Sequence, residues 1–257
     1  MAIVAILIAL LFQTTPEIIE QRLRQYQGDN KQREATLKAL FEASGCKGDK
    51  LAEQPVKHVK EPNVICTLPG STPSVIVVGA HFDRVSKGQG VVDNWSGASL
   101  LPSLFEGLAT QERKHTFVFI GFTAEEEGEI GSKFYVKQLS KEQKTAIRAM
   151  VNMDTLGVSS TKVWQSHADK ELSNLLGQLA GAMKLPLAGV NVEAVGSTDS
   201  EQFRDAGIPA MTIHSITQET WPILHSPRDQ LAAIKLDDYY QTYRLIAAYL
   251  SFIDTKL

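Results

Sequence analysis

Cysteine is almost absent from this sequence: only Cys46 and Cys66 occur among 257 residues. Their separation does not match the spacing of cysteine ligands at a metal site, so a cysteine-based metal centre is excluded. The pair is compatible with one disulfide that would join the first predicted helix to the first predicted strand. Two buried free thiols are the alternative, and the sequence leaves both open.

An excess of charge of one sign is also missing. The formal net charge is −3, which gives no electrostatic reason to expect a nucleic acid or an anionic membrane as a partner. Hydrophobic residues make up 43% and charged residues 21% of the chain, an ordinary balance for a globular protein. No repeat or low-complexity linker interrupts it, and its length suits one α/β domain better than two.

Long apolar runs are lacking except at the N-terminus, where Ala2–Phe12 is unbroken. This run is too short to span a bilayer, so we expect no stable membrane insertion, and it resembles the core of a secretory signal. No basic residue precedes it, since the first is Arg22, and no Ala-x-Ala site follows; a buried strand or helix start is the alternative. We expect a signal-like segment over 1–15, a single domain over 16–257, and export to the periplasm or medium rather than retention in the cytoplasm.

Apolar runs with strand character alternate with segments of helical periodicity. The predicted strands are 63–68, 74–79, 116–122, 148–153, 162–165 and 210–213, and the predicted helices are 16–44, 95–110, 127–139, 170–183 and 237–253. This alternation predicts an α/β fold of three αβα layers, with a mixed, mainly parallel central sheet flanked by helices. In such folds the active site lies at the carboxyl ends of the strands.

Imidazoles and carboxylates follow these strands at the predicted ends. Taken singly, each has an ordinary explanation, such as a solvated acidic turn at 125–127, a helix cap at Asp154 or a loop histidine at His225. Carboxylates at the ends of apolar strands are nevertheless costly to desolvate unless a cation or donors lie there. Histidine nitrogens together with carboxylate oxygens favour zinc. The candidate residues are His81, Asp83, Asp93, Glu125, Glu126, Asp154 and His225.

Five short motifs carry a family resemblance. In order they are His81-Phe82-Asp83, Val92-Asp93-Asn94-x-Ser96-Gly97, Glu125-Glu126-x-Gly128-x-x-Gly131-Ser132, Asn152-x-Asp154-x-x-Gly157 and His225-x-x-x-Asp229. Their order and spacing, from about residue 63 to 229, resemble those of the dizinc aminopeptidases of the aminopeptidase Y family, in a zinc exopeptidase clan that also includes glutaminyl cyclase-like proteins. The segment 203–209 fits the same pattern.

The resemblance implies a zinc-dependent aminopeptidase that hydrolyses the N-terminal peptide bond of peptides with a free N-terminus. Two zinc ions per chain, with a bridging water, would be held by His81, Asp93, Glu126, Asp154 and His225, and Asp93 would bridge them. His81 and Asp154 would complete one zinc site, and Glu126 and His225 the other. Three carboxylates and a bridging hydroxide would balance the four positive charges of the ions, which favours deprotonation of the water.

The resemblance also implies roles for carboxylates that are not ligands. Glu125 would be the general base. Asp83 would accept a hydrogen bond from the ring of His81 and fix its tautomer, and Asp229 would do the same near His225. The peptide bond after Asp93 would be cis, as in related enzymes. Together Glu125 and Asp83 are the predicted catalytic pair.

One departure from the family pattern concerns the substrate pocket. The segment that commonly reads Ser-Asp-His reads Thr198-Asp199-Ser200 here, so we assign no oxyanion-stabilising side chain. His214 and Trp221 either line the pocket or simply pack.

Rival functions share the same scaffold. A glutaminyl cyclase would use a single zinc ion to close an N-terminal glutamine, and a carboxypeptidase of the wider clan usually needs a dimerisation insert for which the chain has no room. A binding domain without activity would have lost ligands or the base, whereas the five predicted ligands and the base Glu125 are all present here.

Overall fold

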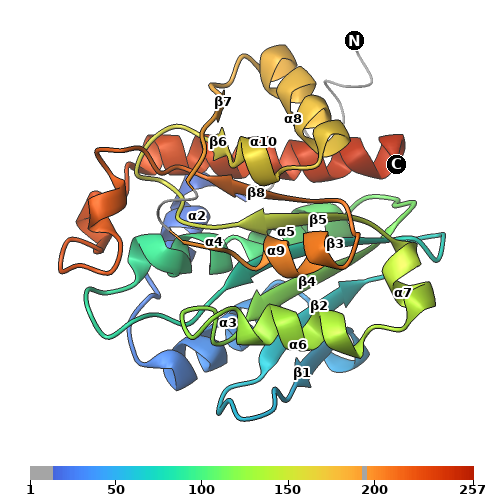
Figure 1. The fold of residues 1–257 in the computed structure, drawn as a ribbon, viewed down its shortest axis with the longest axis horizontal. Helices are drawn as coiled ribbons and strands as arrows, with labels where there is room; N and C mark the ends of the chain where they lie inside the picture. The colour runs from blue at the N-terminus through green and yellow to red at the C-terminus, as the bar shows by residue number, and fades with distance from the viewer. Residues whose placement is uncertain (1–13, 193–195) are drawn as a thin grey trace.

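The structure is a computed structural model that describes residues 14–192 and 196–257. Its centre is an eight-stranded sheet in the order β1-β2-β4-β3-β5-β8-β6-β7 (Figure 1). The strands are β1 (Leu51–Gln54), β2 (Asn63–Leu68), β3 (Val75–His81), β4 (Thr116–Phe122), β5 (Ile147–Met153), β6 (Lys162–Val163), β7 (Ala188–Gly189) and β8 (Ala210–His214). The helices are α2 (Pro16–Leu23), α3 (Asn30–Ala43), α4 (Ser96–Ala98), α5 (Leu101–Ala109), α6 (Ile130–Gln138), α7 (Lys141–Ala146), α8 (Lys170–Met183), α9 (Ser200–Asp205) and α10 (Leu236–Lys256).

The four central strands β4, β3, β5 and β8 run parallel to one another. Strands β1, β2 and β6 pair antiparallel with their inner neighbours, so the sheet is mixed and mainly parallel, as the sequence predicts. β3 and β4 are buried over most of their length because helices cover both faces, which explains their continuous apolar sequences. The carboxyl ends of the central strands therefore meet at one edge of the sheet.

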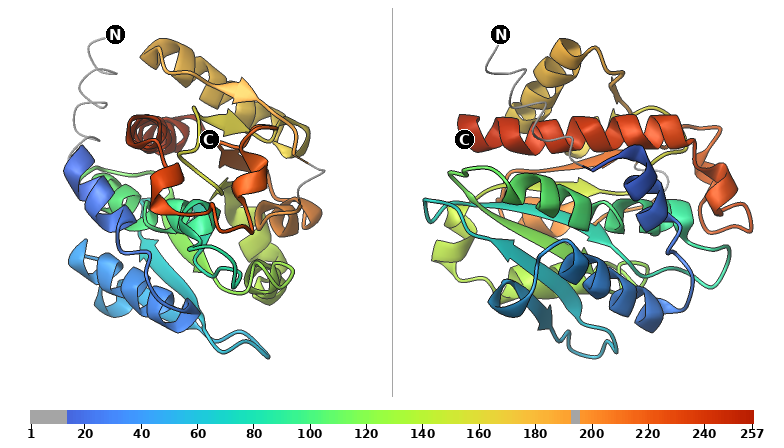
Figure 2. Two further views of the ribbon diagram at one scale, coloured as in Figure 1. Left: turned by 90° about the vertical axis from the view of Figure 1, so that its left-hand side faces the viewer. Right: turned by 180° about the vertical axis from the view of Figure 1, so that it is seen from behind.

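Helices form a layer on each face of this sheet and enclose two cores (Figures 1 and 2). The larger core joins one face to α2, α3, α5, α8 and α10, with side chains such as Leu37, Phe105 and Tyr249. The smaller core joins the other face to α6 and α9 through Val136 and Phe203. The predicted three-layer αβα architecture is confirmed.

The predicted helix over 16–44 is wrong in one respect, because the chain forms two helices there. α2 ends at Leu23, and Gly28 adopts a φ of 104° in the connection. Asp29 then caps α3: its side chain accepts a hydrogen bond from the Gln32 amide, and the Gln32 side chain accepts one from the Asp29 amide. This reciprocal capping box begins a new helix that periodicity alone could not separate from the first.

Two other predicted helices have different bounds in the structure: the segment 95–110 is divided into α4 and α5, and the helix of the segment 127–139 begins later than expected. In the segment 95–110, Pro102 lies in the first turn of α5, a position where its missing amide hydrogen is tolerated. In the segment 127–139, Gly128 and Glu129 have φ values of 103° and 52°, so α6 begins only at Ile130. The acidic stretch is therefore a turn at the end of β4.

The two cysteines form a disulfide that joins the end of α3 to β2, with Cα atoms 6.2 Å apart. Of the two alternatives left open above, the structure has the bridge. Most of the signal-like segment predicted over 1–15 lies outside the described residues. Within the described part of the chain, no helix combines the length and apolar character needed to cross a bilayer.

Candidate metal centre

Three of the parallel strands deliver candidate ligands to the same edge of the sheet. His81 is the last residue of β3, and Asp154 follows directly after β5. Glu125 and Glu126 lie in the turn after β4. His81 is fully buried because the strands on both sides of β3 enclose its end.

Asp93 lies between the two candidate histidines. It belongs to the turn Val91–Trp95, and its peptide bond to Asn94 is cis, as the resemblance implies. Its Oδ1 lies 3.2 Å from Nε2 of His81, and its Oδ2 lies 3.2 Å from Nε2 of His225. The two oxygens of one carboxylate thus face two different imidazoles, which is the arrangement required of a bridging ligand.

The remaining predicted ligands lie on opposite sides of Asp93. Oε2 of Glu126 is 2.9 Å from Nε2 of His225, and Oδ1 of Asp154 is 3.8 Å from Nε2 of His81. Two ligands held at about 2.0–2.2 Å by one tetrahedral ion lie about 3.3–3.6 Å apart. The observed separations of 2.9 and 3.8 Å fall on either side of this range, so a small shift of the side chains would be needed to place each pair on one ion. The structure therefore brings all five predicted ligand side chains together.

Glu125 is close to the same atoms. Donor atoms of His81, Asp93 and Glu126 lie within 4.8 Å of one another, and so do those of His81, Glu125 and Asp154. Proximity alone does not separate Glu125 as a ligand from Glu125 as a base. The zinc content of a Glu125 variant separates the two roles.

Two buried atoms of this cluster support a fit to metal ions. Nε2 of His81 and Oε1 of Glu126 have no hydrogen-bond partner among the described residues. Nδ1 of His81 lies 3.3 Å from the main-chain oxygen of Asp83 and 3.4 Å from its Oδ1. If Nδ1 carries the proton, the lone pair of Nε2 faces the carboxylate of Asp93, and a cation between them would satisfy both atoms.

Asp83 connects the histidine to the acidic turn. Besides facing the ring of His81, its carboxylate accepts hydrogen bonds from the amides of Glu125 (3.1 Å) and Glu126 (3.2 Å). One buried side chain therefore orients a candidate ligand and also positions the main chain of the candidate base.

Asp229 occupies a different place from the one implied by the family resemblance. Its carboxylate accepts hydrogen bonds from the amides of Val92 (2.7 Å) and Asp93 (3.2 Å) rather than orienting the ring of His225. It therefore holds the loop that carries Asp93. Asp229 is close to His225 in sequence, but this spacing does not bring its carboxylate to the imidazole ring. The loop 226–229 directs the side chain towards Val92 instead.

Burial, together with the charges of neighbouring carboxylates, raises the pKa of Glu125 and Glu126. Burial raises the pKa of Glu126 to about 7, with the nearby charge of Asp93 acting in the same direction. Burial also raises the pKa of Glu125 well above its usual value; the imidazole of His81 opposes this and Asp154 adds to it. Like charges in a desolvated space repel, so cations would stabilise the ionised cluster.

The histidines show the complementary effect. A hydrogen bond with Asp93 raises the pKa of the exposed His225 to about 9. Burial opposes protonation of His81, but Glu125 and Asp154 raise its pKa well above the usual value. Burial acts against ionisation of Asp93, and its contacts with the two histidines lower its pKa. In this structure positive charge is therefore favoured where zinc ions are predicted to lie.

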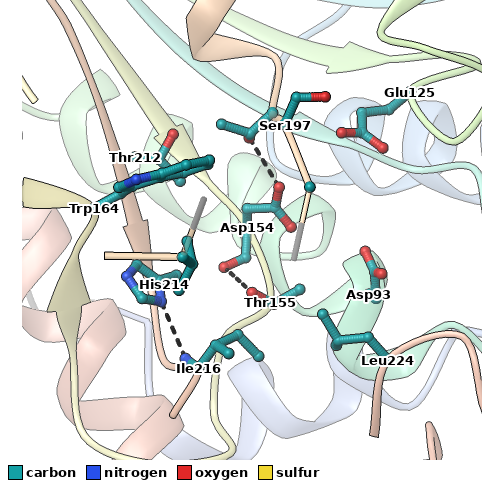
Figure 3. A pocket seen from close by; sticks show the side chains of 13 residues that line it. Asp93, Glu125, Asp154, Thr155, Trp164, Ser197, Thr212, His214, Ile216 and Leu224 are labelled. Carbon is teal, nitrogen blue, oxygen red and sulfur yellow. Dashed lines mark hydrogen bonds between the residues drawn. The ribbon is translucent and has the colours of Figure 1, made fainter. Parts of the chain in front are cut away.

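A pocket opens beside the cluster (Figure 3). Carboxylates of the centre form one side of it, and Trp164 and His214 form the opposite side. Apolar side chains complete the wall, namely Val192, Ile216 and Leu224. The sequence did not indicate Trp164, because it lies just after the short β6 strand and outside every motif.

Of the two aromatic residues proposed from the sequence, only His214 lines the pocket. Its Nδ1 accepts a hydrogen bond from the amide of Ile216 (3.1 Å), and its Nε2 lies 3.3 Å from the carbonyl oxygen of Val190. Burial lowers the pKa of His214 to about 4, so the ring is neutral and both nitrogens are engaged. Trp221 is 46% exposed and is not part of the pocket wall.

Thr198, in the segment that departs from the family pattern, supports a candidate ligand. Its hydroxyl donates to Oδ2 of Asp154 at 2.9 Å and accepts from Nδ2 of Asn152 at 2.7 Å. The hydroxyl therefore leaves Oδ1 of Asp154 to face His81. Ser200, which replaces the histidine of the pattern, shares a hydrogen bond with Thr212, a residue that lines the pocket.

Comparison with known proteins agrees with this geometry. The model of peptidase family M28 matches residues 63–250. The aminopeptidase YwaD of Bacillus subtilis is 27% identical over 228 residues, which cover 84% of this chain and 47% of YwaD. The chain thus spans about half the length of that curated relative, and less of the next ones.

Two solved structures illustrate the shared fold. The LapA aminopeptidase of Legionella pneumophila superposes with a TM-score of 0.86 at 22% identity, covering 98% of this chain and 75% of LapA. BSAP, a zinc aminopeptidase from Bacillus subtilis, gives 0.68 at 26% identity, covering 74% and 49%. Since the family model spans well over half of the chain and includes every residue of the cluster, this protein belongs to peptidase family M28.

Proposed function

We propose that the protein is a zinc-dependent aminopeptidase that hydrolyses the N-terminal peptide bond of peptides. The observation that carries this proposal is Asp93, whose two oxygens each face one histidine beside the pocket lined by Trp164 and His214. The relatives named aminopeptidases support the same activity.

Two zinc ions would be held by the five clustered side chains. His81, Asp93 and Asp154 would hold one, and Asp93, Glu126 and His225 the other. When bound, zinc supplies Lewis-acid chemistry, which polarises a carbonyl and makes a water molecule more acidic.

Glu125 would carry the proton through the reaction. Its carboxylate lines the pocket and lies beside His81 and Asp154, so it can reach both the candidate metal centre and a bound substrate. We propose that it takes a proton from the attacking water, whose oxygen adds to the scissile carbonyl carbon. It then passes that proton to the leaving amine nitrogen as the carbon–nitrogen bond breaks.

The deciding experiment combines zinc analysis with a substrate panel. Purified protein should contain about two zinc ions and hydrolyse aminoacyl-nitroanilides, while N-acetylated analogues remain intact. Chelation should abolish the activity, and added zinc should restore it. One zinc ion at saturation, together with release of ammonia from a glutaminyl peptide, would instead identify a cyclase. Two bound zinc ions without either reaction would identify a binding domain.

The pocket supports a preference for apolar N-terminal residues. Apart from the carboxylates, the described residues of its lining carry no charge: Trp164, Ile216 and Leu224 are apolar, His214 is neutral, and the remaining polar groups are hydroxyls, so a charged substrate side chain would lose water without gaining a charged partner beyond the centre itself. We expect kcat/KM for leucine nitroanilide to exceed those for lysine and glutamate nitroanilides by at least ~10-fold.

Trp164→Ala should lower kcat/KM for the leucine substrate by roughly 10–100-fold, because the substrate side chain loses a large apolar contact. Trp221→Ala is the matched control, since this tryptophan is exposed outside the pocket, and it should have wild-type kinetics. Equal kinetics for both variants would mean that the pocket of Trp164 does not receive the substrate side chain.

We further propose that the protein is exported. The Cys46–Cys66 disulfide supports this, because disulfides persist in oxidising compartments and are rare in the cytoplasm. Fractionation of producing cells, with alkylation of free thiols before lysis, should find the protein outside the cytoplasm with both cysteines protected. A cytoplasmic protein with two alkylated cysteines would contradict export.

A further inference from the structure

A fully buried arginine from the N-terminal helices contacts the main chain of segments that carry the candidate metal ligands. Arg33 is in the first turns of α3 and has no exposed surface. Its guanidinium carbon lies 5.2 Å from the ring centroid of Trp95. α3 precedes residues 63–250, so this arginine lies outside the segment that matches the family model.

Three of the four hydrogen bonds that Arg33 donates go to two segments that carry site residues, and the fourth goes from Nη1 to the carbonyl of Tyr26 at 3.5 Å. Nε donates to the carbonyl of Phe82 at 2.5 Å, and Phe82 lies between His81 and Asp83. Nη2 donates to the carbonyl of Gly90 at 2.9 Å, and Nη1 donates to that of Gln89 at 3.2 Å. Both carbonyls belong to the approach to the turn that carries Asp93. One planar group therefore spans the end of β3 and the loop of the bridging carboxylate.

Asp229 binds the same loop as a hydrogen-bond acceptor, whereas Arg33 binds it as a donor. It accepts hydrogen bonds from the amides of Val92 and Asp93, while Arg33 donates to carbonyls just before them. The close approach needs Gly90, whose φ is 61°, since an added Cβ would lie 2.9 Å from Nη1 of Arg33. Donor and acceptor thus fix the position of Asp93 from two sides.

A charge at this position is not explained by packing alone. Burial lowers the pKa of Arg33 to about 10, so the group remains protonated at neutral pH. No carboxylate among the described residues forms an ion pair with it, although the charges of Asp83, Asp229 and Asp93 act on it at longer range. An apolar side chain would avoid the desolvation of a cation. The guanidinium instead donates to four carbonyls at once, three of them in segments that carry site residues, and the acidic side chains of the site act on its charge.

We propose that Arg33 is a positioning residue for the metal centre, which ties the His81–Asp83 segment to the Asp93 loop and so sets the spacing of the ligands. The inference rests on the proposed dizinc function, because it concerns the same ligands. The N-terminal helices would then contribute to the site and not only to the core.

The test measures zinc affinity by competition with a chromogenic chelator, alongside urea unfolding of the metal-free protein. Arg33→Met should weaken zinc binding by about 10–100-fold, the usual effect of losing a group that orients ligands. Arg33→Lys keeps the charge but lacks the planar fork, so we expect a smaller but measurable loss of affinity. Arg22→Met is the matched control: Arg22 is buried in α2 and donates to Ser103 and Glu106, away from the ligands.

The control separates positioning from general stability. If both methionine variants lose stability without zinc but both bind zinc with wild-type affinity, Arg33 is only structural and the proposal is overturned. If Arg33→Met does not fold, the zinc affinity of Arg33→Lys is the deciding measurement. Wild-type zinc affinity in Arg33→Lys would overturn the proposal. If the wild-type protein binds one zinc ion, this result counts against the proposed function alone. The zinc affinity of Arg33→Met relative to that of the wild type would still test the role of Arg33. A wild-type protein that binds no zinc overturns both.

Discussion

Glu125→Gln is expected to reduce turnover by ~10²–10⁴-fold while leaving two zinc ions bound, because the amide has the same shape but cannot accept the proton of the attacking water. The fold should be unchanged, since the main chain at this position is held by Asp83 through the Glu125 amide and not through the side chain. The measurement is zinc content by elemental analysis together with kcat on a leucine nitroanilide.

Glu126→Gln is the matched comparison, since it changes the neighbouring carboxylate in the same turn. Oε2 of Glu126 lies 2.9 Å from Nε2 of His225, so this variant should lose affinity at one zinc site and lose activity through the missing metal. If Glu125→Gln loses a zinc ion while Glu126→Gln keeps both, the two roles are reversed. Full activity in both variants would make this segment a solvated acidic turn, and the hydrolytic mechanism would be wrong.

Asp93→Asn is expected to have an effect on both metal sites. One oxygen of the carboxylate faces each histidine, and the amide nitrogen of asparagine cannot bind a cation. We expect zinc affinity to fall at both sites and turnover to fall by at least ~10³-fold, since Lewis-acid stabilisation is worth several kcal/mol and about 1.4 kcal/mol corresponds to a factor of ten. Competition with a chelator and initial-rate kinetics measure the two effects.

Asp254→Asn provides the control for loss of a buried carboxylate elsewhere. Asp254 accepts hydrogen bonds from the amides of Lys114 and His115 at the far end of β4, so its substitution should lower stability but not zinc content. An Asp93→Asn protein that retained two tightly bound zinc ions would exclude Asp93 as the bridging ligand. Equal zinc loss in both variants would show that the change acts through stability.

Much of the fold and of the candidate site could be predicted from local patterns. The strand over 116–122 and the helix over 170–183 match β4 and α8 at both ends, because each element has its own apolar pattern bounded by turn residues. The position of His81 and Asp154 at strand ends followed from the same patterns. Parallel strands deliver such residues to one edge of the sheet.

Other features were missed, or depended on contacts between distant segments. The break between α2 and α3 was missed although its signals are local, namely Gly28 and the capping box of Asp29 and Gln32, because apolar periodicity alone was followed across them. Trp164 reaches the pocket only because β6 pairs with β8. Asp229, close to His225 in sequence, instead accepts from the loop of Asp93.

The sequence by itself determined the alternation of strands and helices, the set of candidate ligands and the family resemblance, because these depend on residue type and on short spacing. Only the tertiary structure decided that the two oxygens of Asp93 face His81 and His225. It also decided that Arg33 donates hydrogen bonds to the carbonyls of Phe82 and Gly90. These contacts join residues that lie from a dozen to more than a hundred positions apart. Their geometry is set by how the layers pack around the sheet, and no local pattern in the chain encodes the direction of a side chain across that distance.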